Sequence, residues 1–182
     1  MPVPPFDLAA ALDAFLAQHP ERGADVQRFK AFLAAHPCAF DRSHAHGHFT
    51  GSAWLVDASG RHALLTLHAK LGRWLQPGGH ADGDPDLAAV ALREATEESG
   101  LDELLVEPAI FDLDRHRIPA RDGEPEHWHY DVRFVVRALG STRFRISAES
   151  ADLAWRKVSE LAEDPDLDPS LRRMARMWLR ME

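Results

Sequence analysis

Hydrophobic residues recur at helical spacing in two stretches of the first 36 positions, within residues 6–36. This pattern predicts two amphipathic helices. Each stretch ends at a His-Pro pair, and the residue before a proline is pushed out of the helical region. We interpret residues 1–40 as an N-terminal helical extension that packs on a main domain, residues 41–182. The alternative is a helix pair whose apolar face binds a partner.

After residue 47 the pattern changes to short runs rich in β-forming residues, separated by turn residues such as those at 58–60. Such runs are typical of strands. Two such runs lie close together between residues 48 and 70, and two more lie between residues 105 and 137. The strand pattern is weaker after residue 140. The predicted strands are residues 48–57, 62–70, 105–113 and 126–137, with weaker signals at 143–147 and 152–156.

A glycine-rich loop, residues 71–84, and a helix, residues 84–99, stand between the second and third predicted strands. Asp84 is the expected N-cap, with Pro85 in the first turn, and Gly100 follows the helix end. A last amphipathic helix is predicted at residues 170–181. Helices and strands alternate without a regular βαβ rhythm, so the pattern favours an α/β fold with a layered α/β/α arrangement, or α+β, over a doubly wound sheet.

The composition is that of one globular domain: 182 residues, of which 45% are hydrophobic and 27% charged. No apolar run approaches the roughly 20 residues of a membrane span. The first residues lack a basic segment typical of a signal peptide, and a single cysteine excludes an internal disulfide, so we expect a cytoplasmic protein. A net charge of -8 argues against broad nucleic-acid binding. It allows an anionic substrate, because a bound cation reverses the local field.

Three glutamates crowd the end of the predicted helix. Glu94, Glu97 and Glu98 are three and four residues apart, so they share one face. They repel one another, and the helix dipole disfavours them near a C-terminus. A bound cation would remove this repulsion, and carboxylate oxygens suit Mg²⁺ or Mn²⁺. The plain alternative is a solvated acidic face.

The stretch that contains these glutamates resembles the Nudix box, G-x5-E-x7-R-E-U-x-E-E-x-G-U, where U is aliphatic. One position departs: Pro85 stands where the first glutamate is expected, flanked by two aspartates, and Ala95 occupies the first aliphatic position. The order of the strands extends the resemblance loosely from about residue 47 to residue 161. The matching residues are Gly79, Arg93, Glu94, Glu97, Glu98, Gly100 and Leu101.

The resemblance implies a Nudix-like α/β/α sandwich with a mixed sheet, and a hydrolase that cleaves a nucleoside diphosphate linked to another group. It implies that Glu94, Glu97 and Glu98 bind Mg²⁺ or Mn²⁺, that Gly79 offers backbone near the metal, and that Arg93 orients a carboxylate. The general base stays open among Glu94, Glu98 and the later carboxylates at 149 and 152. A homodimer is compatible with the resemblance. The alternative, kept open by the proline, is a non-catalytic domain that binds a nucleotide.

The predicted strand at 126–137 separates polar from apolar residues by parity. His127, His129, Asp131 and Arg133 share the polar face, which would meet solvent, line the active site or hold a transition metal. All three readings stay open, and the second makes these residues candidates for substrate binding.

Other basic residues lie near the box. His80 lies inside the box loop, and Lys70 and Arg73 precede it as candidate phosphate contacts, with ordinary surface charge as their alternative. His44, His46 and His48 alternate just before the first strand. A zinc site is conceivable there, but a plain loop is favoured.

Overall fold

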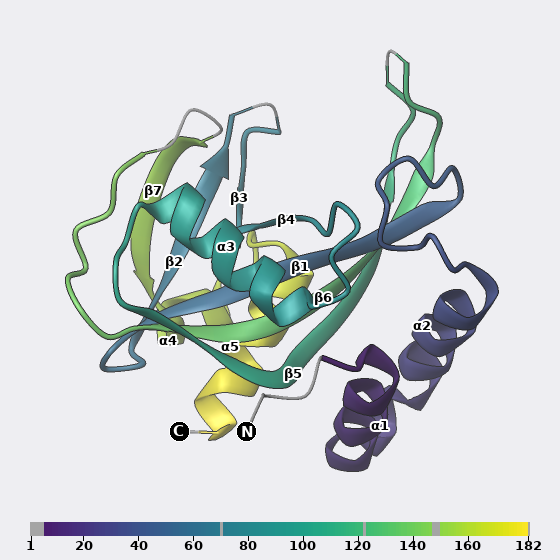
Figure 1. The fold of residues 1–182 in the computed structure, drawn as a ribbon. Coiled ribbons are helices and arrows are strands. Elements are labelled where there is room, and N and C mark those ends of the chain that lie inside the picture. Colours follow the sequence, from purple (N-terminus) through teal and green to yellow (C-terminus); the bar gives the residue numbers. More distant parts are fainter. Residues whose placement is uncertain (1–5, 70, 122, 147–149, 182) are drawn as a thin grey trace.

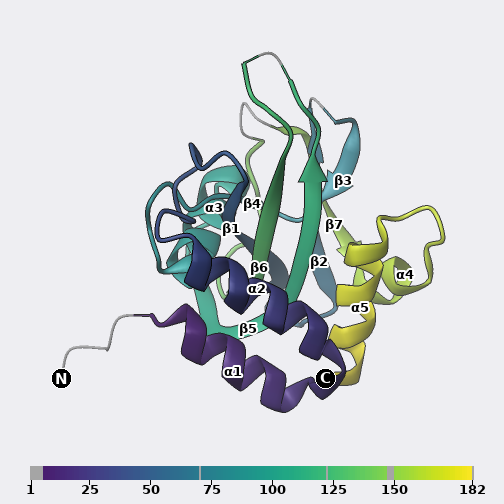
Figure 2. The same ribbon diagram turned by 90° about the vertical axis from the view of Figure 1, so that its right-hand side faces the viewer.

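The computed structural model describes residues 6–69, 71–121, 123–146 and 150–181 (Figure 1). A seven-stranded mixed sheet forms the centre, and helices cover both of its faces (Figures 1 and 2). The layered α/β/α prediction is therefore confirmed.

Five strands follow the order β3-β2-β1-β6-β5, with β4 paired to β1 and β7 paired to β2. The central pair, β1 and β6, is parallel, and the other pairs are antiparallel. The strands are β1 (Gly47–Asp57), β2 (His62–His68), β3 (Arg73–Leu75), β4 (Gly78–His80), β5 (Leu104–Ile118), β6 (His127–Ala138) and β7 (Ser150–Lys157).

One loop prediction and two strand predictions need correction. The predicted loop at 71–84 contains the short strands β3 and β4, whose three residues each are too few for a periodic signal. Strand β5 runs on to Ile118, past the predicted end at 113. Residues 143–146 form no strand, and the rest of that weak prediction lies outside the described residues.

The helices largely agree with those predicted from the sequence. No helix in the described part of the chain is long and apolar enough to cross a membrane. Asp86, not Asp84, caps the helix of the box through a bond from the Ala89 amide to its Oδ1 (3.0 Å). Gly100 ends that helix with a φ of 62°. The elements are α1 (Leu8–Gln18), η1 (Pro20–Arg22), α2 (Gly23–Ala35), α3 (Leu87–Ser99), α4 (Val158–Glu163, not predicted) and α5 (Pro169–Met181).

The N-terminal helices share their core with the sheet. Phe29 and Phe32 of α2 pack against Phe49 of β1 and Tyr130 of β6, and the Phe32 and Tyr130 rings stack at 3.9 Å. The apolar faces of α1 and α2 are thus occupied within the chain, as expected for a packed extension. The boundary at residue 40 stays a prediction.

A buried carboxylate joins the extension, the sheet and the last helix. Asp112 of β5 is 0% exposed and accepts hydrogen bonds from Arg22 of η1 (2.8 Å), Arg133 of β6 (3.2 Å) and Arg173 of α5 (2.7 Å). A buried charge is tolerated when it is paired and hydrogen-bonded in this way. Because these arginines come from three different elements, Asp112 fixes how those elements sit on β5.

We predict that Asp112→Ala destabilises the protein by about 3–5 kcal/mol, because three arginines lose their shared buried partner and are left only partly compensated by Asp25, Asp114 and Asp131. Urea unfolding measures the change. The matched control is Asp13→Ala: Asp13 is 61% exposed and pairs with Lys30, and such a surface pair contributes at most about 1 kcal/mol. Equal losses in the two variants would contradict the proposed importance of the buried cluster.

Candidate functional site

Two carboxylates of α3 rest directly on the backbone of β4. The amide of Gly78 donates to Glu98 Oε1 at 2.8 Å. A Cβ atom built on Gly79 would lie 2.5 Å from Glu94 Oε2. Glycine at position 79 thus leaves room for the Glu94 carboxylate, which a Cβ atom there would displace.

Helix α3 comes this close because its inner side is small and apolar. Val90, Ala91 and Ala95 are fully buried against the sheet. On β1, a Cβ atom at Gly51 would lie 2.8 Å from the carbonyl oxygen of Leu87, so glycine again permits the approach. The same helix leaves Glu97 exposed at its outer side.

Arg93 ties the β4 segment to the helix. Its Nη2 donates to the carbonyl oxygen of His80 at 3.0 Å and to Glu94 Oε1 at 3.1 Å. One guanidinium thus holds the backbone after Gly79 and the carboxylate that faces Gly79. This is the geometry of a residue that orients a carboxylate.

The position that departs from the box motif faces the N-terminal extension. Pro85 lines an open hollow of about 600 Å³ together with Phe6, Leu8, Leu33 and Phe40. The flanking aspartates engage nearby backbone: Oδ1 of the first accepts from the amide of the second at 2.9 Å, and the second caps α3. The apolar neighbours account for a proline at this place.

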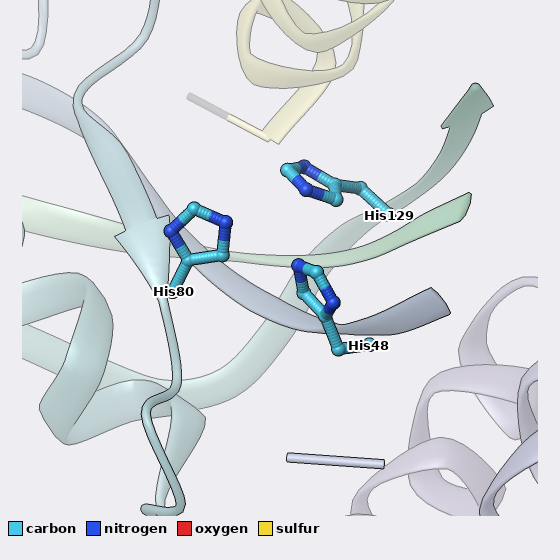
Figure 3. Close-up of side chains that lie close together, drawn as sticks. All are labelled: His48, His80 and His129. Atoms are coloured by element: carbon cyan, nitrogen blue, oxygen red, sulfur yellow. The ribbon is translucent and has the colours of Figure 1, made fainter. Parts of the chain in front are cut away.

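The other face of the sheet carries a group of histidines. His48 of β1 pairs in register with His129 of β6, and Thr50, two residues along β1, pairs with His80 of β4. Side chains two residues apart share a face, so the three imidazoles meet on the face opposite α3. Figure 3 shows the rings turned toward one another, and one ligand nitrogen of each lies within 4.8 Å of the others.

Two more histidines adjoin this group. The ring centroid of His127 lies 5.0 Å from that of His48, and the ring centroid of His116 lies 5.3 Å from that of His129. Nδ1 of His116 lies 3.1 Å from an oxygen of Asp114. The predicted strand parity is thus confirmed, and the histidines cluster on one face.

Burial sets the protonation of these rings. Burial, and secondly the neighbouring histidines, lowers the pKa of His48 to about 4 and that of His129 to about 2. Burial also lowers the pKa of His80, with Arg42 as the next cause. Burial is also the largest single influence on His116 and acts in the same direction, but the hydrogen bond with Asp114 and the charges of Asp131 and Asp114 together outweigh it and raise that pKa. The three converging rings are therefore neutral near pH 7.

Asp131 and Arg133 form part of the framework. Both are 2% exposed. Asp131 Oδ1 accepts from the hydroxyls of Thr50 (2.8 Å) and Ser52 (2.7 Å), and its Oδ2 accepts from Nε of Arg133 (2.7 Å). These buried side chains hold β1 and β6 together, and their contact with a substrate stays a prediction.

Of the remaining basic candidates, the structure describes Arg73 alone. Arg73 of β3 pairs with Asp168, just before α5, at 2.7 Å. Lys70 lies outside the described residues, as does the acidic candidate at 149. Asp152 lies on β7, in register with Leu67 of β2.

The alternating histidines at 44, 46 and 48 do not form one group. His44 and His46 cluster with His36, at ring-centroid distances of 4.6 and 6.0 Å from it. His48 instead belongs to β1 and turns toward His80 and His129. The alternation of His46 and His48 can be read from the sequence. The parallel pairing of β1 with β6, which brings His48 to His129, cannot.

Comparison with known proteins identifies the family. Residues 48–177 match the NUDIX domain, and the chain therefore belongs to the Nudix hydrolase family. No protein with a curated description matches the chain.

Solved structures share the fold. A *C. elegans* Ap4A hydrolase in a binary complex is 15% identical, with a TM-score of 0.58, over 73% of this chain and 96% of that one. A NUDIX-family hydrolase from *Clostridium perfringens* is 24% identical, with a TM-score of 0.53, over 74% and 98%. An ADP-ribose pyrophosphatase from *Streptococcus suis* is 18% identical, with a TM-score of 0.52, over 74% and 91%.

We predict that Gly79→Ala displaces the Glu94 carboxylate and lowers the unfolding free energy by about 1 kcal/mol, the lower end of the usual overpacking effect, because the end of a flexible side chain can move. Thermal denaturation tests this. Gly23→Ala is the control: its Cβ would meet its nearest neighbour at 3.7 Å, so we expect no loss, or a gain of about 0.4–1 kcal/mol. Unchanged stability of Gly79→Ala would show that β4 and α3 are not in tight contact.

A second prediction concerns acid. The pKa of a histidine in the unfolded chain is about 6.5. Folding lowers the pKa of His48 to about 4. Its stabilising contribution is thus fully present above the unfolded pKa and is lost as the pH falls toward the folded one. In the presence of a chelator, urea unfolding should show stability falling across this window, less steeply in His48→Gln. Equal slopes would refute the assignment.

Proposed function

We propose that this protein is a divalent-metal-dependent hydrolase that cleaves a phosphoanhydride bond in a nucleoside diphosphate linked to another group. The observation that carries the proposal is the contact of Glu94 and Glu98 with the glycine backbone of β4. Membership of the Nudix family supports the reaction class. The Ap4A hydrolase and the ADP-ribose pyrophosphatase with the same fold support substrates of this kind.

The residues fit a hard divalent cation. Glu94, Glu97 and Glu98 supply carboxylate oxygens from one helix face, the ligand type that Mg²⁺ and Mn²⁺ prefer. The bare backbone at Gly79, where a Cβ atom would strike Glu94, keeps space beside these oxygens. When bound, such an ion neutralises diphosphate charge and polarises a phosphoryl oxygen.

The chain's own groups would position the reaction. Arg93 holds Glu94 and the His80 carbonyl in place, and Glu98 fixes the Gly78 amide. Glu97 is exposed and open to an incoming substrate. A carboxylate of α3 or Asp152 would accept the proton of the attacking water. The imidazoles of His80, His127 and His129 lie on the other face of the sheet, so we propose no direct part for them in this chemistry.

The specific substrate is to be found among nucleoside triphosphates, nucleotide sugars, ADP-ribose and dinucleotides. The cytoplasmic location and the homodimer stay predictions. The rival function is nucleotide binding without catalysis, which the proline at position 85 favours because the first glutamate of the motif is lacking.

The test is product release from a panel of these compounds with Mg²⁺ or Mn²⁺. We expect one class to turn over, and Glu97→Gln or Glu98→Gln to lower kcat/KM by roughly 100-fold or more, because each removes a charged ligand of the ion. Glutamine keeps the size of the side chain, so the fold should persist.

The matched control is Glu160→Gln on α4, whose side chain is 59% exposed and pairs with Lys157; it should keep the native rate. Undiminished rates in the α3 variants would overturn the metal assignment. Nucleotide binding without turnover under any condition would replace the hydrolase with the binding domain.

A further inference from the structure

The three converging imidazoles are spaced almost as the ligands of one ion. One nitrogen each from His48, His80 and His129 falls within a 4.8 Å span. In a tetrahedral site with metal–nitrogen distances of about 2.0 Å, ligand nitrogens lie roughly 3.3 Å apart. Small side-chain rotations that move each ligand nitrogen by about 1 Å or less close this difference.

The cluster also leaves polar atoms unsatisfied. His48 is 2% exposed, and neither of its ring nitrogens has a hydrogen-bond partner among the described residues; the same holds for Nε2 of His129. A buried polar group without a partner costs about 1–3 kcal/mol. Such atoms call for a ligand that the protein atoms do not supply, either an ion or water.

From these observations we propose that His48, His80 and His129 form a second metal site, which binds a divalent transition metal ion such as Zn²⁺ and is distinct from the α3 carboxylates. Neutral imidazole suits Zn²⁺ and its neighbours in the first transition series, whereas Mg²⁺ prefers oxygen. The rings are neutral near pH 7, which is the form that binds metal.

The surroundings supply further parts of such a site. The His127 ring, 5.0 Å from that of His48, is placed to give a fourth nitrogen, or water takes that position. Arg42 now contacts Nδ1 of His80 at 2.8 Å. An ion bound at this atom takes the place of Arg42, an exposed side chain that keeps its ion pair with Asp82.

The site has a structural consequence for β4. Its three ligands come from β1, β4 and β6, so one ion fastens three strands at the same end of the sheet. His80 directly follows Gly79, the residue that faces Glu94. Zinc bound by the histidines therefore stiffens β4, the strand that contacts Glu94 and Glu98, without contacting these carboxylates itself.

The experiment is a Zn²⁺ titration by calorimetry of metal-free protein in excess Mg²⁺, which occupies the oxygen ligands. We expect one equivalent of Zn²⁺ to bind and the melting temperature to rise. His80→Ala and His129→Gln should each weaken binding by at least about 10-fold, as expected when a ligand or its support is lost. Circular dichroism checks that each variant folds.

Two controls keep the readout specific. His62→Ala removes a histidine of β2 that pairs with Asp57 and should leave Zn²⁺ affinity unchanged. The double variant His44→Ala/His46→Ala removes the other histidine cluster and should do the same. Loss of binding in this double variant alone, or native affinity in His80→Ala and His129→Gln, would overturn the proposal.

Co²⁺ gives an independent readout on the native protein. Nitrogen ligands in a four-coordinate site should give the intense visible absorption of tetrahedral Co²⁺, and added Zn²⁺ should abolish it. A weak octahedral spectrum, or no bound ion, would exclude the site even if a variant failed to fold.

Discussion

The close contact between the backbone of β4 and the carboxylates of α3 is the constraint on which the functional end of the molecule depends. The Gly78 amide donates to Glu98, Gly79 leaves room for Glu94, and Arg93 donates hydrogen bonds to both Glu94 and the His80 carbonyl. Carboxylates at helical spacing repel one another in isolation. Here the fold holds Glu94 and Glu98 beside the backbone of β4, the arrangement that the proposed metal site requires.

Because β4 is a strand, the same segment serves both faces of the sheet. The backbone at Gly79 faces α3, whereas the side chain of the next residue, His80, turns to the opposite face and meets His48 and His129. The α3 carboxylates and the neutral imidazoles thus lie on opposite sides of one strand. Farther along the sheet, Asp131 accepts a hydrogen bond from the buried Arg133 of β6. Asp112 accepts hydrogen bonds from Arg22 of the N-terminal extension and Arg173 of α5, and so joins both to the sheet.

The sequence predicts well what depends on local spacing. The box motif placed α3 and its glutamates, and strand parity placed His129, Asp131 and Arg133 on one face. It could not show that Asp131 and Arg133 are buried, because their partners come from residues distant in the chain. It could not bring His48 to His129 either, since that needs the parallel pairing of β1 and β6. Strands of three residues, such as β4, carry no periodic signal at all.

The most direct test of the central claim is to locate Mn²⁺ by anomalous scattering in crystals grown with a non-hydrolysable nucleoside diphosphate analogue. The account predicts a Mn²⁺ peak within bonding distance of carboxylates among Glu94, Glu97 and Glu98, with the diphosphate against the same ion. A bound nucleotide with no Mn²⁺ on α3, or a Mn²⁺ peak at some other place in the fold, would contradict it.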